Sequence, residues 1–270
     1  MPDKTVVITG ASGGIGAGLA YRLAADRNRL VLAARRESEL QAVAAEAERR
    51  GAPRALIVPV DVTRRSDVEA LRDAALAEFE SFDVWVNNAG RGITRSVVDL
   101  SDADVDEMIA VNVKSALYGM QVAVRYFMER GSGHVINVSS FLGRVPMAVH
   151  RSAYNAAKAS LNALTANLRV ELHARYPDIH VTLVMPGMVA TEFARNALGA
   201  APDTLTYSGS HMQTVEQVAD VIANVIEHPV AEVYTNPGSA DMARRYFEDV
   251  GKFERDAGNP WGSPPPSAPR

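Results

Sequence analysis

Cysteine is absent from this 270-residue chain. Its absence excludes disulfides, thiolate nucleophiles, cysteine-ligated zinc and iron–sulfur clusters. Long apolar runs are also missing, and none approaches the roughly 18 residues that a membrane-spanning helix requires. The excess of one sign of charge is small, because 28 Lys and Arg residues and 32 Asp and Glu residues leave a net charge of −4. Such a chain has no general attraction for nucleic acid or anionic membranes, so we expect neither as a partner.

A secretion signal is not recognisable near residue 1. The apolar stretch 5–8 is too short for the core of a signal peptide, and no small-residue cleavage pattern follows it. We therefore expect a cytoplasmic protein. The six histidines are scattered without the spacing of metal ligands on a helix face, so we also expect no metal site.

The chain contains a regular alternation of two kinds of segment. The expected strands, short and apolar, are Thr5–Thr9, Arg29–Ala33, Ala55–Val60, Val84–Asn87, His134–Val138, His180–Met185 and Glu232–Thr235. The expected helices, with an apolar period near that of an α-helix, cover residues 15–27, 37–50, 66–80, 102–130, 153–175 and 214–228. Strands that are apolar on both faces and alternate with helices predict an α/β fold. We expect a Rossmann-like, doubly wound parallel sheet of about seven strands with helices on both faces.

No linker rich in proline, glycine or serine interrupts this series before residue 258. We therefore expect a single domain over residues 1–257. The segment 258–270 is rich in all three residue types, which predicts an extended or disordered tail. A tail that docks on a neighbouring subunit is the alternative.

Glycines cluster after the first expected strand, in the run Thr9-Gly10-Ala11-Ser12-Gly13-Gly14-Ile15-Gly16. Glycine permits a tight turn and lets backbone amides approach a pyrophosphate. The helix that follows directs its free N–H groups and its dipole to the same place. A strand–turn–helix that needs glycine only for its geometry is the alternative. The position at the start of a βαβ unit favours dinucleotide binding.

The spacing Thr-Gly-x-x-x-Gly-x-Gly resembles that of the short-chain dehydrogenase/reductase family, simple type. Further motifs follow in that family's order: Asn87-Asn88-Ala89-Gly90, Asn112, Ser139-Ser140, Tyr154-x-x-x-Lys158, and Pro186-Gly187 with Thr191. The resemblance covers about residues 5–235. It implies an oxidoreductase that transfers a hydride between a nicotinamide cofactor and a carbonyl compound or secondary alcohol.

Tyr154 and Lys158 are one helical turn apart, so they project from the same face. A free tyrosine has a pKa of about 10, and a nearby ammonium lowers it toward the range useful for acid–base catalysis. A surface tyrosine beside a solvated lysine is the alternative. The resemblance implies that Tyr154 is the acid/base and that Lys158 also binds the nicotinamide ribose.

Two further catalytic residues are expected beside this pair. The family register, three residues before Gly143, selects Ser140 rather than Ser139, and adjacent strand residues point to opposite faces. The Ser140 hydroxyl would hydrogen-bond the substrate oxygen. Asn112 is expected to hold water or backbone beside Lys158 and complete a proton path. A buried asparagine that satisfies a local helix distortion is the alternative.

The residues after the second expected strand bear on the choice of cofactor. NAD-preferring relatives keep an acidic residue where this chain has Ala34, and Arg35 and Arg36 follow it. Arginine accommodates a ribose 2′-phosphate, so we predict NADP(H) rather than NAD(H). Two observations leave NAD(H) open: both arginines could be the solvated start of a helix, and Gly13 replaces a basic residue often seen in NADP-preferring relatives. The expected cofactor contacts are Gly10, Ser12, Gly13, Gly14, Ile15, Gly16, Arg35, Arg36, Asp61, Val62, Asn88, Ala89, Gly90, Tyr154, Lys158, Pro186, Gly187, Val189 and Thr191.

Ligands of open α/β sheets bind beyond the carboxyl ends of the strands. The loops after the fourth, fifth and sixth strands therefore supply the substrate contacts, and those expected are Ser140, Leu142, Met147, His150, Met188 and Phe193. Residues 188–213 are long for a connector and are expected to form a lid over the substrate.

Two rival functions stay open beside an NADP-dependent dehydrogenase or reductase. One is a nucleotide-binding regulator without turnover, although such proteins usually lose the tyrosine or lysine that this chain keeps. The other is an epimerase or dehydratase that oxidises its substrate only transiently. The resemblance also implies a homodimer or homotetramer built on helices 102–130 and 153–175. The substrate is expected to be a small molecule whose identity the sequence does not name.

Overall fold

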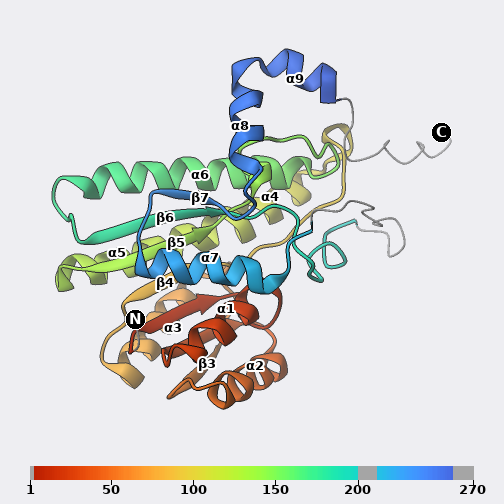
Figure 1. Ribbon diagram of the computed structural model, residues 1–270. Helices are drawn as coiled ribbons and strands as arrows, with labels where there is room; N and C mark the ends of the chain where they lie inside the picture. The colour runs from red at the N-terminus through yellow and green to blue at the C-terminus, as the bar shows by residue number, and fades with distance from the viewer. Residues whose placement is uncertain (1–2, 200–211, 258–270) are drawn as a thin grey trace.

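The computed structural model describes residues 3–199 and 212–257, around a central seven-stranded sheet (Figure 1). Its strands are β1 (Thr5–Thr9), β2 (Arg29–Ala34), β3 (Ala55–Pro59), β4 (Val84–Asn87), β5 (Gly133–Val138), β6 (Ile179–Met185) and β7 (Glu232–Tyr234). They lie in the order β3-β2-β1-β4-β5-β6-β7, and every neighbouring pair is parallel. The predicted doubly wound α/β sheet is confirmed. Where a strand end differs from the expected one, it differs by one residue.

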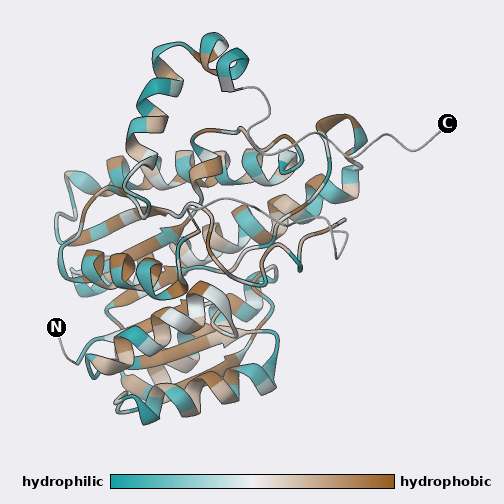
Figure 2. Ribbon diagram, turned by 45° about the vertical axis from the view of Figure 1, so that its right-hand side comes forward, coloured by the Kyte–Doolittle hydropathy of each residue, from teal (hydrophilic) through white to brown (hydrophobic). Residues whose placement is uncertain are grey.

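Helices cover both faces of the sheet. The face packed against Val6 and Ile8 carries α1 (Gly14–Ala25), α2 (Glu37–Arg49) and α7 (Val215–Glu227). The face packed against Val7 carries α3 (Arg65–Phe79), α5 (Ser115–Arg130) and α6 (Ser152–His173). Alternate residues of β1 thus serve two separate cores, as the pleat of a strand requires. Figure 2 shows the apolar strands enclosed between helices whose outward sides are hydrophilic.

The expected helix 102–130 is not one α-helix. It consists of α4 (Asp102–Ile109), a π-helical turn over Ala110–Lys114 and α5. A capping box at Ser101 and Asp104 starts α4, and Gly131, with φ of 87°, ends α5 in the left-handed conformation. Both ends carry ordinary sequence signals, whereas a π turn has none that periodicity reveals.

The direction of winding changes between β1 and β4, which are direct neighbours in the sheet. Thr9 ties their carboxyl ends together. Its Oγ1 accepts hydrogen bonds from the backbone N–H groups of Asn88 (3.0 Å) and Ala89 (3.2 Å) and donates to the Val86 carbonyl (3.3 Å). A ligand crevice is expected at such a switch point of an open α/β sheet.

Two helices near the end of the described chain, α8 (Ser239–Glu248) and α9 (Val250–Ala257), were not expected from the sequence. Ala243, Tyr246 and Phe253 pack there against Phe141 and Val145, which follow β5. In Figure 1 the pair stands beyond the sheet, above α6. Both helices are short and contain few apolar residues, so neither forms an apolar helical pattern long enough to predict a helix from the sequence. Short 3-10 turns cover Val97–Asp99 and Phe141–Gly143.

None of the helices within 3–199 and 212–257 is long and apolar enough to cross a membrane. The same residues contain no cluster of three or more His, Cys, Asp or Glu side chains arranged to hold a metal ion. The expected tail, 258–270, and the middle of the expected lid, 200–211, lie outside the described residues.

Candidate active site

The glycine loop between β1 and α1 packs directly on the loop after β4. A Cβ on Gly10, whose φ is 68°, would lie 2.8 Å from the Ala89 Cα, and a Cβ on Gly16 would collide with the Gly10 carbonyl. The Asn88 amide donates to the carbonyls of Thr9 (2.9 Å) and Gly10 (3.2 Å). Only glycine fits these two positions, and Asn88 holds the loop in place.

The outer side of the same loop is open, which fits a pyrophosphate. A Cβ on Gly13 would meet only an Arg36 nitrogen, at 3.5 Å, and one on Gly14 (φ 53°) would meet the Thr191 methyl, at 3.4 Å. Gly13 caps α1 without any side-chain hydrogen bond, and Ile15 packs inward on the core. The N–H groups of the first helical turn are thus left to a ligand, as dinucleotide sites require.

Arg36 contacts the glycine loop, and Arg35 acts on the residue that follows β3 by two positions, Asp61. The Arg36 Nη2 donates to Ser12 Oγ (3.1 Å) and to its carbonyl (3.3 Å), and Nη1 pairs with Glu39 (3.1 Å). Burial alone would raise the pKa of Asp61, but hydrogen bonds from Thr63 and the positive charge of Arg35 lower it below its usual value. Val62 packs on the core beneath them. Two guanidinium groups therefore converge around the loop and the end of β3.

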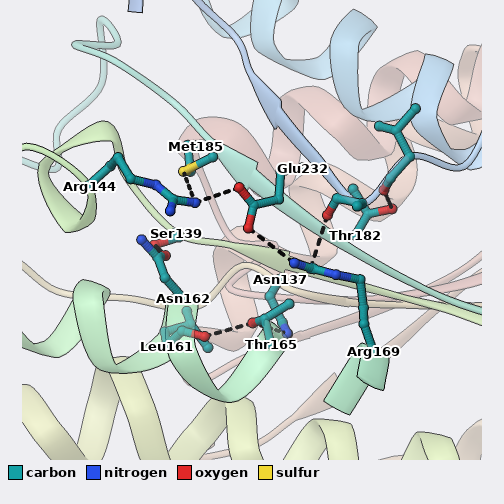
Figure 3. A network of polar contacts seen from close by, with 12 residues as sticks. Asn137, Ser139, Arg144, Leu161, Asn162, Thr165, Arg169, Thr182, Met185 and Glu232 are labelled. Atoms are coloured by element: carbon teal, nitrogen blue, oxygen red, sulfur yellow. Dashed lines mark hydrogen bonds and ion pairs between the residues drawn. The ribbon is translucent and has the colours of Figure 1, made fainter. Parts of the chain in front are cut away.

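Buried polar contacts fix the position of α6 against the sheet (Figure 3). Asn137 of β5 donates to Thr165 of α6 (2.9 Å), and Thr165 donates back to the carbonyl of Leu161 (2.7 Å). At the edge of the sheet, Glu232 of β7 is paired with Arg169 of α6 (3.1 Å) and with Arg144 (2.5 Å), which follows β5. Since α6 carries Tyr154 and Lys158, these contacts set the register of the candidate catalytic pair.

Tyr154 and Lys158 point to one side of α6 and are both buried, with 7 % and 3 % of their surface exposed. The Lys158 Nζ donates to the Val138 carbonyl (2.9 Å) and lies 5.7 Å from the centre of the Tyr154 ring. A Cβ on Gly90 would lie 3.5 Å from Nζ, so the loop after β4 closes over the lysine. Burial rules out the surface alternative for this pair.

The electrostatics of the pair differ from the expectation that Lys158 lowers the pKa of Tyr154. Burial raises the pKa of Tyr154 to about 12, against smaller effects of a hydrogen bond with Ser140 and the charge of Arg151. Burial also lowers the pKa of Lys158 to about 8. Burial therefore favours the neutral form of both groups. The Lys158 charge lowers the pKa of Tyr154 where the two ionised forms occur together and attract each other.

The two adjacent serines have different partners. Ser139 donates to Asn162 Oδ1 (2.6 Å) and to the Lys158 carbonyl (3.3 Å). Figure 3 labels Ser139 and Asn162. Ser140 Oγ accepts from the Leu142 N–H (3.1 Å) and is the hydrogen-bond partner of Tyr154. The structure thus places Ser140, and not Ser139, beside the tyrosine hydroxyl.

Ser140→Ala is expected to lower kcat by about 10²–10³-fold, because it removes the donor that faces the substrate oxygen. Ser139→Ala is the matched control. It should cost about 1–3 kcal/mol in the free energy of unfolding, since Asn162 loses a buried partner, and leave kcat near the wild-type value. Kinetics and urea denaturation of both variants check this. A larger loss of kcat in Ser139→Ala would mean that the serines were assigned the wrong way round.

Asn112 lies within the π turn and is 1 % exposed. Its Nδ2 donates to the carbonyls of Arg91 (2.9 Å) and Met108 (3.1 Å), and its Oδ1 accepts from the Arg91 N–H (3.2 Å). A Cβ on Gly90 would lie 3.0 Å from Oδ1. Asn112 therefore holds the backbone that covers Lys158 and also lies at a helix distortion, while its part in a proton path stays a prediction.

The expected substrate residues separate into two groups. Leu142 packs in the same cluster as Tyr154 and Ile93, and the Phe193 ring lies edge-on to Tyr154 with ring centres 5.5 Å apart. Met147 instead packs with Phe141 and Tyr246 in the cluster around α8. The structure does not bring Met147 to the tyrosine, because the loop after Ser140 turns toward the C-terminal helices.

The loop after β6 reaches back over the site. The Met188 carbonyl accepts from Gln213 N–H (2.9 Å), and the Pro186 carbonyl accepts from Phe141 N–H (2.8 Å). Gly187 faces Asn236, and Val189 packs on the core near α1. The half-buried His150 has its pKa lowered by burial and by the adjacent Arg151, and its carbonyl accepts from Arg95 N–H (2.8 Å).

The described part of the expected lid docks on the loop after β4. Thr94 N–H donates to the Leu198 carbonyl (2.7 Å), and Leu198 N–H donates to the Gly92 carbonyl (2.9 Å). Together with Phe193 on Tyr154, these contacts place residues 191–199 across the mouth of the site.

Sequence reasoning missed Arg151, which is only 6 % exposed. It lies three residues before Tyr154, at the start of α6, and its charge acts on the tyrosine. The spacing argument that paired Tyr154 with Lys158 applies equally to Arg151 and would have found it.

Comparisons with known proteins agree with this geometry. The sequence model of the family described as short chain dehydrogenase matches residues 4–200. The Bacillus subtilis oxidoreductase YxnA is 33 % identical over 236 residues, which are 87 % of this chain and 65 % of that relative. The chain thus spans just under two thirds of that relative's length.

Solved structures give the same result. A short-chain dehydrogenase/reductase from Burkholderia phymatum in complex with NAD is 26 % identical with a TM-score of 0.84, covering 93 % of this chain and 95 % of that one. An alcohol dehydrogenase from the archaeon Thermococcus sibiricus, complexed with 5-hydroxy-NADP, is 26 % identical with a TM-score of 0.74, covering 86 % and 95 %. Since the family match extends over more than half of the chain, this protein belongs to the short-chain dehydrogenase family of oxidoreductases.

Proposed function

We propose that this protein reduces a carbonyl compound, or oxidises the corresponding secondary alcohol, with NADP(H) as the cofactor. The observation that carries the proposal is the meeting of Ser140, Tyr154 and Lys158 beside the open glycine loop. The segment after β5 supplies Ser140 and α6 supplies Tyr154 and Lys158, at the carboxyl edge of one parallel sheet, where ligands of such sheets bind.

In the proposed reaction, the Ser140 hydroxyl donates a hydrogen bond to the substrate carbonyl and holds its oxygen next to Tyr154. During reduction, Tyr154 gives its phenolic proton to that oxygen; during oxidation, the phenolate takes the proton back. Asn112 keeps the loop around Gly90 folded over Lys158. The described lid residues, with Phe193 on Tyr154, exclude water from the reacting groups.

The residues around the glycine loop fit a nicotinamide dinucleotide. Gly13, Gly14 and the N-terminus of α1 would hold the pyrophosphate, Thr191 would close it in, and Lys158 would bind the ribose. The cofactor supplies or accepts the hydride when bound. Arg36, which donates to Ser12 in the glycine loop, and Arg35, whose charge acts on Asp61 after β3, support NADP(H) over NAD(H), because two cations there would stabilise a 2′-phosphate.

The test is consumption of NADPH, with NADH in parallel, over aldehydes, aliphatic and cyclic ketones, β-ketoesters, quinones, sugars and steroids. We expect turnover with NADPH and at least one carbonyl class. Tight NADPH binding without any turnover would favour the regulator instead. No binding of either cofactor would refute the proposal at its first step.

Arg35→Ala is expected to weaken NADPH binding by about tenfold to hundredfold and to leave NADH nearly unchanged, because a charge-assisted contact contributes about 1.5–3 kcal/mol. Arg36→Ala should act in the same direction. Arg72→Ala removes a guanidinium paired on the surface of α3 and serves as control. Fluorescence titration with both cofactors checks the result. Equal losses for NADPH and NADH would show that the arginines do not contact a 2′-phosphate.

Three further expectations stay predictions. Residues 1–257 form one domain with a lid over about 188–213, and the protein is cytoplasmic. It assembles as a homodimer or homotetramer through α4, α5 and α6, and Val170 of α6, with 77 % of its surface exposed, supports such a contact. Size-exclusion chromatography with light scattering measures the assembly.

A further inference from the structure

Arg151 is a buried cation without a carboxylate partner among residues 3–199 and 212–257. Its side chain is 6 % exposed, and its one hydrogen bond there runs from Nη1 to the Ile93 carbonyl (3.1 Å). Other arginines of the described chain that are less buried do have carboxylate partners: Arg91 pairs with Glu107, Arg130 with Asp83, and Arg144 and Arg169 with Glu232. A buried charge is costly unless it is paired, so an unpaired one points to an anion that arrives with a ligand.

The guanidinium lies at the substrate side of the site. A Cβ on Gly92 would lie 3.1 Å from Arg151 Nη1 and 2.9 Å from the Phe193 ring, and Phe193 in turn covers Tyr154. The positive charge of Arg151 lowers the pKa of Tyr154, which again places it near the reacting hydroxyl. Arg151 and Phe193 therefore both pack on Gly92, and Phe193 also contacts Tyr154.

Among the described residues, the cluster around Tyr154 contains no carboxylate. Ile93, Leu142 and Leu198 line the tyrosine cluster with apolar groups, and His150 adds no negative charge. Lys158 is a second buried cation. Its Nζ donates to the Val138 carbonyl, and the proposed function assigns it to the cofactor ribose. Arg151 also lies at the N-terminus of α6, where the helix dipole disfavours a cation and favours an anion.

We propose that Arg151 binds a carboxylate of the substrate, so that this enzyme acts on carbonyl acids or hydroxy acids with otherwise small, apolar bodies. The inference rests on the proposed oxidoreductase function and narrows its substrate class. The planar fork of the guanidinium matches the two oxygens of a carboxylate. A carboxylate carries one negative charge and therefore balances the single positive charge of Arg151, whereas a phosphate monoester would bring a second negative charge.

The test compares 2-oxo, 3-oxo and 4-oxo acids of four or five carbons with their methyl esters, using NADPH. In the wild type, the best acid should have a higher kcat/KM than its ester. Arg151→Met should lower kcat/KM for the acid by about tenfold to hundredfold, mainly through KM, and change the ester by less than about threefold. Arg95→Met, which removes a guanidinium paired with Asp104, is the control and should leave the acid preference unchanged.

A purely structural Arg151 would lower acid and ester alike, and an Arg151 that acts only on Tyr154 would lower kcat for both and move the pH profile. Either result, or an ester preference in the wild type, overturns the proposal.

A second measurement does not need turnover: the Tm of the NADPH complex with each acid or ester. The acids should raise Tm in the wild type but not in Arg151→Met. If no compound is turned over, the proposed function fails, while this difference in Tm still decides whether Arg151 binds the carboxylate; equal shifts in both proteins refute it.

Discussion

Tyr154→Phe is expected to reduce kcat/KM by about 10²–10⁴-fold at neutral pH, the usual contribution of a positioned general acid or base. The substitution removes only the hydroxyl that faces Ser140. The ring stays in place, because its contacts with Phe193 and with the cluster around Ile93 do not depend on the hydroxyl. The loss should therefore appear in the chemical step, with NADPH binding unchanged.

Steady-state kinetics on the best substrate, together with fluorescence titration of NADPH, separate these effects. Tyr126→Phe removes a tyrosine hydroxyl from the core behind β4 and β5 and should leave kcat/KM near the wild-type value. If Tyr154→Phe kept more than about a tenth of the wild-type kcat/KM, the proton would reach the substrate oxygen by another route.

Lys158→Met is expected to lower kcat/KM by about 10²-fold or more and to shift the alkaline rise of the oxidation rate to higher pH. Oxidation needs the Tyr154 phenolate, and burial raises the pKa of that hydroxyl to about 12. The Tyr154 phenolate and the Lys158 ammonium attract each other, so the lysine favours ionisation of the tyrosine and the phenolate favours the protonated lysine. Without the lysine, the phenolate forms only at higher pH.

The pH dependence of the oxidation rate, measured with saturating NADP⁺, checks the shift. Lys252→Met, an exposed lysine on α9, is the control and should leave the profile unmoved. The Tm of Lys158→Met should not fall, because the variant replaces a buried charge with an apolar chain of similar volume. A pH profile identical to that of the wild type would show that Lys158 does not support the ionisation of Tyr154.

The sheet was predictable because its strands are apolar on both faces and its helices are long and periodic. The helix at 102–130 was predictable only in outline, since a π turn leaves the apolar pattern nearly intact. The helices α8 and α9 escaped because their few apolar residues, such as Tyr246 and Phe253, follow from contacts with Phe141 rather than from a repeating pattern.

The positions of the candidate site residues followed from motif order, but their electrostatics did not. Spacing places Tyr154 and Lys158 on one face of a helix, yet it says nothing of burial, and burial moves both pKa values toward their neutral forms. The surroundings of Arg151 could not be predicted from the sequence either. Its charge is visible in the sequence, whereas the lack of a partner depends on which side chains the fold brings to it.

The π turn at Ala110–Lys114 sets the rotational phase between α4 and α5. Each residue of an α-helix advances the side chains by about 100°, and a π turn accommodates one residue more than an α turn. The α5 side chains that face the sheet, Ala116, Met120, Ala123 and Phe127, are thereby rotated independently of the Ser101 cap that starts α4. With one residue fewer in the turn, a continuous α-helix would present either this apolar stripe or Asn112 in the wrong direction. The irregular turn therefore lets one helical segment satisfy two demands, packing on the sheet and holding the loop over Lys158, that a regular helix of the same length could not meet together.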